Sequence, residues 1–410
     1  MEKNGEKCRV LCFYLPQFHR TPENDEWWGT GYTEWTAVKG AKLYFRTQIQ
    51  PKEPLNDNYY DLADESGSVW KWQSRLARKS GIYGFVIYHY WFGGRKVLDK
   101  PVNILLEHPE IDIRYSLCWD NNEWRRTWYG TREEILIPQE YGDEQMWRKH
   151  FEDLLPFFRD KRYIKLDNKP VFHIYASSKI DKLSQMKAYW NRLAQENGFS
   201  GIYLVAGDLL DRKYQECLDA YYNFEPNRIQ VQSRYSIWLH PLIDCLGGFR
   251  KGIGKILKKN LVDVRYTPVL YKLIVREKLN QEERLKEKHF RLLNLSTYKS
   301  RQIGVKTYRG LYVNYDDTPR RQEKGIVYVG GSPRLLQQAL RDLLIKSMKE
   351  QKEFLYLNAW NEWGEGAYIE PDKRNKYGYL IAVRNAIREA ERLSTRVKCN
   401  RLWLREESGR

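Results

Sequence analysis

The sequence has few of the features that mark metal, redox and membrane proteins. Its six cysteines include no Cys-x-x-Cys pair and no Cys/His spacing typical of a zinc site. We therefore expect buried free thiols in a reducing cytoplasm, and no metal site. No stretch approaches the roughly 20 consecutive apolar residues that a membrane span requires. The chain is not expected to be integral to a membrane.

Motifs of several functional classes are also missing. No zinc-finger, RNP or helix-turn-helix pattern occurs, which argues against a nucleic-acid partner. No Gly-x-Gly-x-x-Gly follows a strand and no Asp-x-Asp is present, so two frequent features of nucleotide-sugar enzymes are absent. No apolar leader precedes Cys8. We expect a cytoplasmic location from this pattern.

Aromatic residues, in contrast, are abundant. The chain has 15 Trp and 30 Tyr, and many of them must pack the core. Trp27, Trp28 and the cluster at residues 124–128, however, lie among turn residues and charges. Indole and phenol rings have a flat apolar face and a polar tip, which complement the CH faces and hydroxyl edges of a sugar. We expect these clusters to contact a sugar ligand.

The net charge of +17 indicates an acidic partner. Much of this excess lies in Phe249–Arg309, which carries 17 Lys and Arg against 5 Asp and Glu. Residues 249–259 combine an apolar helical face with basic residues, as in helices that lie on anionic membranes. We expect an anionic membrane surface or a lipid-linked saccharide there, with peripheral binding at the inner membrane. The alternative is a solvated insertion without a partner.

Short runs rich in Val, Ile, Tyr and Phe alternate with stretches of helical periodicity, which is typical of repeated βα units. Eight such units close naturally into a (β/α)8 barrel of the α/β class; an open doubly wound sheet is the alternative. The expected strands are Arg9–Leu15, Gly84–Tyr90, Arg114–Trp119, Val171–Tyr175, Ile202–Ala206, Ala220–Phe224, Leu311–Tyr315 and Phe354–Trp360. The expected helices include Ser66–Lys79, Glu144–Phe158, Lys182–Asn197, Pro333–Lys349 and Tyr377–Leu393.

The domain expectation is a single barrel over residues 1–410 with long βα loops. A basic insertion over residues 228–308 separates strands six and seven. Residues 396–410 form a C-terminal tail.

Polar and aromatic residues collect directly after six of the expected strands. One such strand end is unremarkable, because Asp and Asn turns are common there. In a barrel, however, the carboxyl ends of the strands form the catalytic face, so we expect these segments to meet at one cavity. They are Pro16–His19, His89–Trp91, Asp120–Trp124, Glu225–Asn227, Asp316–Asp317 and Asn361–Gly366.

Glu362 and Glu365 are the strongest catalytic candidates. They lie three residues apart after an apolar strand, flanked by tryptophans and glycines. Cleavage of a glycosidic bond needs one protonated carboxyl group and a second that acts as base or nucleophile. Two acids in an aromatic, partly desolvated pocket have different pKa values, which provides one of each. The alternative is a pair of surface acids that bind Lys373 or Arg374.

Four long motifs carry a resemblance to a known family. In this order they resemble the WbsX-like proteins of bacterial surface-polysaccharide gene clusters, which are related to glycoside hydrolase family ninety-nine. The resemblance covers most of the chain apart from the basic insertion. The motifs are Tyr14-Leu-Pro-Gln-Phe-His19; Pro22-Glu-Asn-Asp-Glu-Trp-Trp-Gly29 with Tyr32-Thr-Glu-Trp35; Tyr83-Gly-Phe-Val-Ile-Tyr-His-Tyr-Trp91; and Asn358-Ala-Trp-Asn-Glu-Trp-Gly-Glu-Gly366 leading to Glu370-Pro-Asp372.

The resemblance implies a (β/α)8 barrel and a retaining mechanism without a metal or cofactor. Glu362 would be the base that assists attack by the sugar's own 2-hydroxyl. Glu365 would donate a proton to the leaving oxygen and later activate water or an acceptor hydroxyl. The motifs and strand ends together suggest substrate contacts from Tyr14, Gln17, His19, Trp28, Glu34, Trp35, His89, Tyr90, Trp91, Trp119, Asn121, Glu123, Trp124, Asn361 and Trp363.

The sequence departs from the family at the third strand. Relatives read Trp-Ala-Asn-Glu before the next Trp, whereas this chain reads Trp119-Asp-Asn-Asn-Glu-Trp124. The departure bears on the roles of Asn121 and Glu123. The basic insertion is a second departure.

Three functions stay open from the sequence. The first is glycoside-hydrolase chemistry on bacterial surface polysaccharide. The second is a cytoplasmic glycosyltransferase of O-antigen, lipopolysaccharide or capsule biosynthesis, because a barrel with two glutamates can pass a glycosyl group to an acceptor instead of water. The third is a non-catalytic barrel that only binds glycan.

Overall fold

The structure is a computed structural model, which describes residues 7–44, 48–126, 134–207, 217–226, 305–328 and 330–407. The amphipathic helix expected at 249–259 lies outside these residues, as does most of the basic insertion expected at 228–308. In the described part of the chain, no helix is long and apolar enough to cross a membrane.

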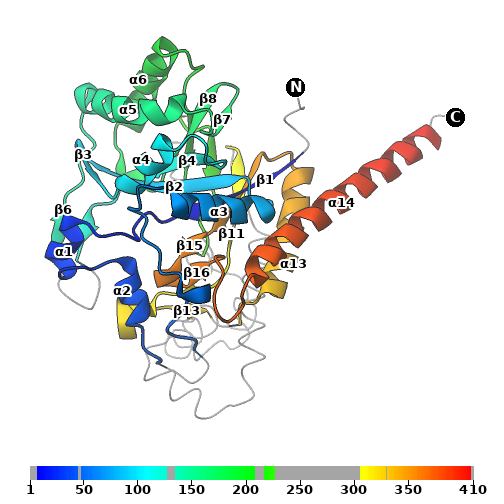
Figure 1. Cartoon of the computed structure of the whole chain (residues 1–410). Coiled ribbons are helices and arrows are strands. Elements are labelled where there is room, and N and C mark those ends of the chain that lie inside the picture. Colours follow the sequence, from blue (N-terminus) through cyan, green and yellow to red (C-terminus); the bar gives the residue numbers. More distant parts are fainter. Residues whose placement is uncertain are drawn as a thin grey trace, which may run out of the picture.

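Eight parallel strands close into a barrel (Figure 1). The first strand, β1, pairs with both β2 and β14, which closes the sheet. The (β/α)8 barrel is therefore confirmed, and the open doubly wound sheet is excluded. In chain order the strands are β1 (Arg9–Tyr14), β2 (Gly84–Phe92), β4 (Arg114–Trp119), β8 (Lys169–Ile174), β9 (Tyr203–Ala206), β10 (Ala220–Tyr222), β11 (Thr307–Tyr312) and β14 (Phe354–Asn358).

Strand β11 begins four residues earlier than expected. Its first residues include Thr307 and Arg309, whose polar character hid them in the sequence pattern. Both side chains are nevertheless buried. Arg309 is accommodated because its Nη2 atom lies 2.6 Å from Glu350 Oε1, just after helix α13 (Pro333–Lys349). A partner from another element thus overrides the local preference.

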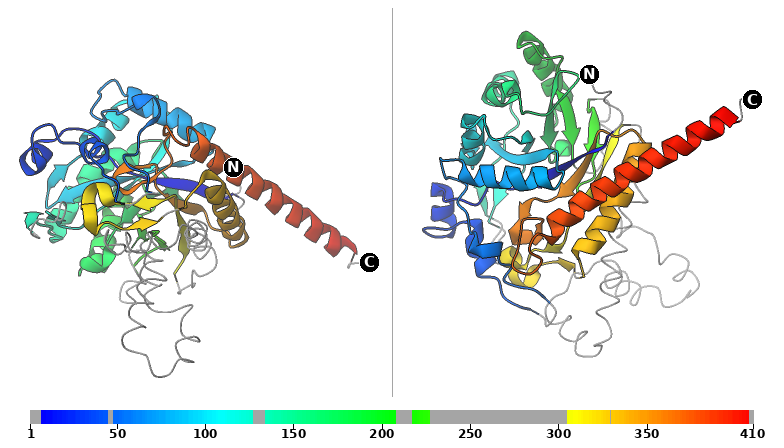
Figure 2. Two further views of the ribbon diagram at one scale, coloured as in Figure 1. Left: turned by 90° about the horizontal axis from the view of Figure 1, so that it is seen from below. Right: turned by 45° about the vertical axis from the view of Figure 1, so that its right-hand side comes forward.

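Helices cover the outside of the barrel (Figures 1 and 2). All five expected helices form, with small shifts at their ends: α3 (Ser68–Lys79), α5 (Glu144–Arg159), α6 (Leu183–Glu196), α13 and α14 (Gly378–Glu407). Some begin at a cap that the sequence supplies. Asp143 accepts hydrogen bonds from Gln145 and Met146 at the start of α5, and such a cap satisfies amide groups that would otherwise lack partners.

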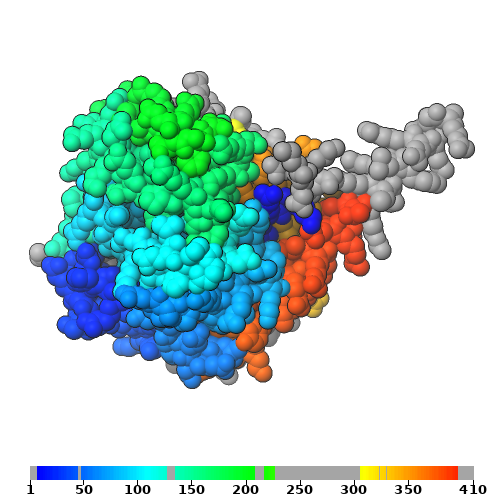
Figure 3. Space-filling model, turned by 45° about the horizontal axis from the view of Figure 1, so that its top comes forward, coloured from blue at the N-terminus to red at the C-terminus, as the bar shows by residue number. Residues whose placement is uncertain are grey.

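Helix α14 lies along α13 and extends away from the body (Figure 2). On the face drawn in Figure 3, its part before residue 396 lies beside α3. The expected C-terminal tail at 396–410 is therefore helical as far as Glu407. Helical periodicity and the absence of Gly and Pro from residues 379–407 account for this continuation.

The interior of the barrel is filled by aromatic side chains. Phe13 and Tyr222 lie 5.8 and 5.0 Å from the ring of Tyr356, and His173 Nε2 lies 2.9 Å from the Tyr356 hydroxyl. Such packing leaves functional residues to the loops at the strand ends.

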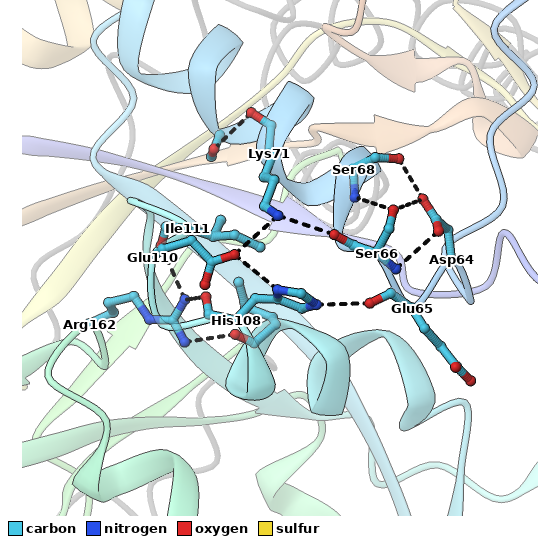
Figure 4. Close-up of polar contacts among 11 residues, drawn as sticks. Asp64, Glu65, Ser66, Ser68, Lys71, His108, Glu110, Ile111 and Arg162 are labelled. Carbon is cyan, nitrogen blue, oxygen red and sulfur yellow. Dashed lines mark hydrogen bonds and ion pairs between the residues drawn. The ribbon is translucent and has the colours of Figure 1, made fainter.

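Polar contacts join the segments around α3 and α4 (Lys100–Glu107) (Figure 4). His108 lies between the Glu65 carbonyl, 2.8 Å from Nε2, and Glu110 Oε1, 2.9 Å from Nδ1. Arg162 binds the backbone carbonyls of Leu105, His108 and Ile111. These contacts hold three segments together at some distance from the cavity described below.

Cys8, Cys12 and Cys118 are free and buried, as expected, and Cys217 is also buried. Cys245 and the side chain of Cys399 lie outside the described residues.

Candidate active site

A cavity of about 530 Å³ lies at the carboxyl ends of the barrel strands. Its walls come from the last part of β2, which extends two residues further than expected, and from the segments that follow β1, β4, β8, β10, β11 and β14. The expectation of one shared cavity therefore holds for most strand ends. Glu225 and Asp316–Asp317 are buried and do not line it. The expected site residues that line the cavity are Gln17, Trp28, Tyr90, Glu123, Trp124, Glu362 and Glu365.

Glu362 and Glu365 are held by a tight turn after β14. Strand β15 (Asn361–Glu362) pairs with β16 (Ala367–Tyr368), and the 3-10 helix η7 (Trp363–Glu365) joins them. Gly366 ends the turn with φ 60°, a conformation that favours glycine. The Glu362 side chain is 7% exposed and that of Glu365 is 26% exposed.

Arg320 joins the two glutamates. It lies in the short helix α12 (Thr318–Arg321) that follows β11. Its Nη2 atom donates to Glu362 Oε2 at 2.9 Å, and its Nη1 atom donates to Glu365 Oε1 at 3.0 Å. Lys373, which was the alternative partner for these acids, binds Glu53 and Asp57 instead, at 3.0 and 2.7 Å.

Glu34 is a third carboxyl group on the same guanidinium. It begins helix α2 (Glu34–Lys39), and its Oε2 atom accepts from Arg320 Nε at 3.1 Å. Three carboxyl groups thus surround one cation in a buried place. Burial of charged groups is costly unless they are paired and hydrogen-bonded, and Arg320 provides both for this cluster.

Burial raises the pKa of Glu362, Arg320 opposes this effect, and Glu365 adds to it. Burial likewise raises the pKa of Glu34 against the opposing effect of Arg320. Removal from water destabilises a carboxylate, while a neighbouring cation stabilises it. Arg320 is therefore the group that favours the ionised forms of these carboxyls.

Glu370 stabilises the turn that carries Glu362 and Glu365 through buried hydrogen bonds. Its carboxylate accepts hydrogen bonds from the indoles of Trp360 and Trp363, at 2.9 and 2.7 Å, and from Tyr60 and Gln73. Burial raises the pKa of Glu370 to about 7, and these hydrogen bonds oppose the rise. Glu370 thereby fixes both tryptophans that flank Glu362.

Aromatic rings form one wall of the cavity. Trp124 meets Trp27 edge-on at 5.7 Å between ring centroids and Tyr90 at 5.2 Å. Gln17 Nε2 donates to the Tyr90 hydroxyl at 2.8 Å. Indole and phenol rings packed this way offer apolar faces beside polar groups, which suits a sugar ring.

The other expected site residues are buried and do not line the cavity. Their polar atoms are mostly bound by protein: Tyr14 by Gln73, Trp35 by the Tyr60 carbonyl, His89 by His150, Trp91 by Asp153, and Trp119 by the Trp91 carbonyl. Direct substrate contact stays a prediction for all of them. The remaining ones are His19, Glu34, Asn121, Asn361 and Trp363. Asn121 binds the backbone N–H and C=O groups of Ala176, Asn361 binds the backbone of Leu15, and Trp363 binds Glu370.

Several cavity residues were not singled out from the sequence. Asp120 and Tyr175 stand at expected strand ends, and that position was the available signal. Arg320 and Lys179 carried no local signal, because 70 Lys and Arg are spread over the chain. Burial raises the pKa of Asp120 in the cavity wall.

The described residues contain no group of three or more His, Cys, Asp or Glu side chains arranged to hold a metal ion. The acids of the cavity instead bind an arginine, as given above.

Several solved structures share the fold. A GH99 endo-alpha-mannosidase from Bacteroides thetaiotaomicron has a TM-score of 0.52 at 12% identity, covering 94% of this chain and 98% of that one. A glycoside hydrolase-like protein has a TM-score of 0.51 at 12% identity, covering 94% of this chain and 96% of the other. At these identities the likeness concerns the fold alone.

Sequence relatives are closer. The uncharacterized protein WxcX of Xanthomonas campestris pv. campestris (strain ATCC 33913) is 29% identical over 399 residues, which cover 95% of this chain and 51% of the relative. Its counterpart in strain B100 is 28% identical over the same length. The chain thus spans about half the length of these curated relatives. The family model described as glycosyltransferase WbsX matches residues 10–383, so the chain belongs to the WbsX glycosyltransferase family.

Proposed function

We propose that the protein is a carbohydrate-active enzyme that cleaves glycosidic bonds of a bacterial surface polysaccharide by a retaining, hydrolase-type mechanism. The observation that carries the proposal is that Glu362 and Glu365 line one cavity and bind one guanidinium. Family membership and the barrel shared with endo-alpha-mannosidases support carbohydrate chemistry. The aromatic wall supports a sugar ligand.

Glu362 acts as the base on the substrate's 2-hydroxyl. A sugar hydroxyl is a weak acid, so a carboxylate with a raised pKa removes its proton more effectively than an ordinary one. Burial raises the pKa of Glu362 in the required direction, with Arg320 favouring the ionised form. Burial thus supplies the strength of the base, and Arg320 partly offsets its cost to ionisation.

Glu365 donates a proton to the leaving oxygen and later activates water or an acceptor hydroxyl. Its larger exposure, 26% of the side chain against 7% for Glu362, supports this division. A group that exchanges protons with incoming water needs access to it. Glu365 Oε1 binds Arg320, which leaves Oε2 for the proton.

The 2-hydroxyl route restricts the substrate. A 2-acetamido or 2-deoxy sugar in the reacting position cannot form the required intermediate, so we expect no turnover of such substrates. An α-linked mannoside, which has the free 2-hydroxyl, is the first class to test. Efficient turnover of a 2-deoxy analogue would contradict the role of Glu362.

The family description favours a second candidate, a cytoplasmic glycosyltransferase. In this version an acceptor hydroxyl replaces water in the second step, and the same two glutamates serve. Peripheral binding at the inner membrane, through residues 249–259 and a lipid-linked saccharide, would bring the enzyme to its acceptor. Location and membrane partner are both proposals.

Product analysis tests the proposal. Wild type, Glu365→Gln and the exposed control Glu152→Gln are incubated with an α-linked manno-oligosaccharide panel and with a bacterial capsular polysaccharide. A parallel set contains a panel of nucleotide-sugars and acceptors. We expect reducing oligosaccharides from wild type and Glu152→Gln, and a loss of at least about 100-fold in Glu365→Gln.

The other outcomes select among the alternatives. Nucleotide-dependent extension of an acceptor would replace the hydrolase by the transferase. Saturable glycan binding without turnover in any set would favour the non-catalytic barrel.

A further inference from the structure

Three carboxylates from two separate segments, the start of α2 and the turn after β14, bind all three nitrogens of the Arg320 guanidinium. Nε donates to Glu34 Oε2 at 3.1 Å, Nη2 to Glu362 Oε2 at 2.9 Å and Nη1 to Glu365 Oε1 at 3.0 Å. The guanidinium group is planar and rigid. The place of one carboxyl group relative to this plane therefore constrains the other two.

Glu34 differs from the other two acids. It is 1% exposed and does not line the cavity, whereas Glu362 and Glu365 do. Its Oε2 atom contacts both Nε and Nη2 of Arg320, each at 3.1 Å. These contacts lie on the buried side of the guanidinium, away from the cavity. Glu34 thus holds Arg320 from behind while Nη1 and Nη2 reach the cavity acids.

Gly364 leaves the space that this arrangement needs. A Cβ atom at Gly364 would lie 2.7 Å from both Arg320 Nε and Glu34 Oε2. The glycine between the two cavity glutamates therefore allows the Arg320–Glu34 pair to approach the turn. The spacing Glu-Trp-Gly-Glu and the arginine are parts of one arrangement.

We propose that Arg320 is the positioning residue of this site. Held by Glu34, it binds one oxygen of Glu362 and one of Glu365, favours the ionised form of Glu362, and leaves the second oxygen of each glutamate for proton transfer. This inference rests on the proposed function. The opposing effects of burial and Arg320 on the pKa values of Glu362 and Glu34 support it.

Two substitutions separate the charge of Arg320 from its shape. Arg320→Gln removes the cation; Arg320→Lys keeps a cation but loses the planar fork. Arg162→Gln is the matched control. Arg162 is 9% exposed against 8% for Arg320 and is also bound on several nitrogens (Figure 4), but it does not line the cavity. Its loss affects stability without touching the site.

The first readout is the pH profile of kcat/KM with a fluorogenic α-mannobioside as the probe. For Arg320→Gln we expect kcat to fall at least about 100-fold with a much smaller change in KM. The ascending limb of the profile should shift upward by about 1–3 pH units, because a cation this close lowers a carboxyl pKa by that amount. Arg320→Lys should recover most of the shift while kcat stays low. Arg162→Gln should melt at a lower temperature with an unchanged profile.

The second readout needs no turnover. The carboxyl ¹³C signal of Glu362, assigned through Glu362→Gln, is titrated in wild type and in the Arg320 variants. We expect its midpoint to rise in Arg320→Gln and to return towards wild type in Arg320→Lys. If wild type does not cleave the probe, the proposed function fails for that substrate class, and this titration still tests Arg320.

Glu34→Gln tests the anchor even if Arg320→Gln does not fold. We expect kcat to fall at least about 10-fold while the folded variant retains Arg320 and its charge. An unchanged Glu362 midpoint in folded Arg320→Gln would overturn the proposal. So would an equal shift in Arg162→Gln, or wild-type kcat in Glu34→Gln.

Discussion

Gly364 is the residue whose smallness the site depends on most directly. Its φ angle is not in the left-handed region, so the contacts of an added Cβ atom, at 2.7 Å from Arg320 Nε and Glu34 Oε2, decide the effect of a substitution. For Gly364→Ala we expect a loss of at least about 100-fold in kcat and about 1–3 kcal/mol in the free energy of unfolding, as for other overpacked sites. Steady-state kinetics and urea unfolding measure these.

Gly40→Ala is the matched control for that prediction. Gly40 has φ −80° and follows α2, and its added Cβ would lie 3.2 Å from the Thr36 carbonyl oxygen. It should keep wild-type kcat. Near-normal activity in Gly364→Ala would show that the Arg320–Glu34 pair can move without loss.

Glu370 should stabilise the turn through the hydrogen bonds that it accepts from four donors. A glutamine at this position keeps one acceptor oxygen and directs an NH₂ group at groups that are themselves donors. We expect Glu370→Gln to lower the free energy of unfolding by about 1–3 kcal/mol, the cost of leaving buried groups unsatisfied. Urea unfolding at about pH 5, below the raised pKa of Glu370, measures it, with exposed Glu152→Gln as the control.

The difference in unfolding free energy between wild type and Glu370→Gln should depend on pH, with a defined sign. Burial raises the pKa of Glu370 to about 7, above its ordinary value near 4.3. The folded state therefore binds this proton more tightly than the unfolded state. The stability that this bound proton contributes is fully present below the ordinary carboxyl pKa near 4.3 and is lost as the pH rises through about 7. The advantage of wild type over Glu370→Gln should shrink over that interval; a constant advantage would contradict the raised pKa.

At the scale of elements, His108 joins the segment before α3 to the segment after α4 (Figure 4). The Glu65 carbonyl and then Glu110 raise the pKa of His108, because both accept hydrogen bonds that the imidazolium form can donate. This stabilisation is complete below the ordinary pKa near 6.5 and is lost as the pH rises through the raised value.

In wild type, the melting temperature should therefore include a contribution from His108 that is lost as the pH rises above about 6.5. His108→Gln should lack this pH-dependent contribution. Differential scanning fluorimetry from pH 5.5 to 9 checks this, and added salt should weaken the effect of Glu110, which is exposed to solvent. Parallel melting curves for wild type and variant over the whole range would contradict the prediction.

At the scale of the whole molecule, closure of the barrel links strands that are distant in sequence. Cys12 lies in β1 and Cys118 in β4, and burial raises the pKa of both thiols. β2 pairs with both strands, so the detachment of either strand breaks the closed sheet. We expect both thiols to resist alkylation in the native protein and to react together on unfolding, at equal rates by peptide mass spectrometry. Early reaction of Cys12 alone would show that the barrel opens at β1.

The net charge of +17 concerns the whole molecule as well. If residues 249–259 bind an anionic surface, the protein should sediment with vesicles rich in phosphatidylglycerol, and the bound fraction should fall with salt. Replacing Lys251, Lys255, Lys258 and Lys259 by glutamate should abolish the binding. Equal sedimentation of wild type and this variant would contradict the membrane proposal.

The barrel was predictable because its signals are local. Buried strands and amphipathic helices each carry their own periodicity, and eight alternating units leave few ways to close. The start of β11 was missed because Thr307 and Arg309 are polar, and the pairing of Arg309 with the distant Glu350 has no local signal. The continuation of α14 beyond residue 395 was missed because that stretch was assigned as a tail.

The sequence by itself determined the barrel, the segments at its carboxyl end and the candidate pair Glu362 and Glu365, because strand periodicity and a short acid spacing are properties of adjacent residues. Only the tertiary structure decided which of the aromatic and polar residues face the cavity, and that Arg320 and Glu34 meet the pair. Arg320 is 286 positions from Glu34 and 42 from Glu362 along the chain. Such a contact leaves no local pattern, since it arises only when the barrel closes.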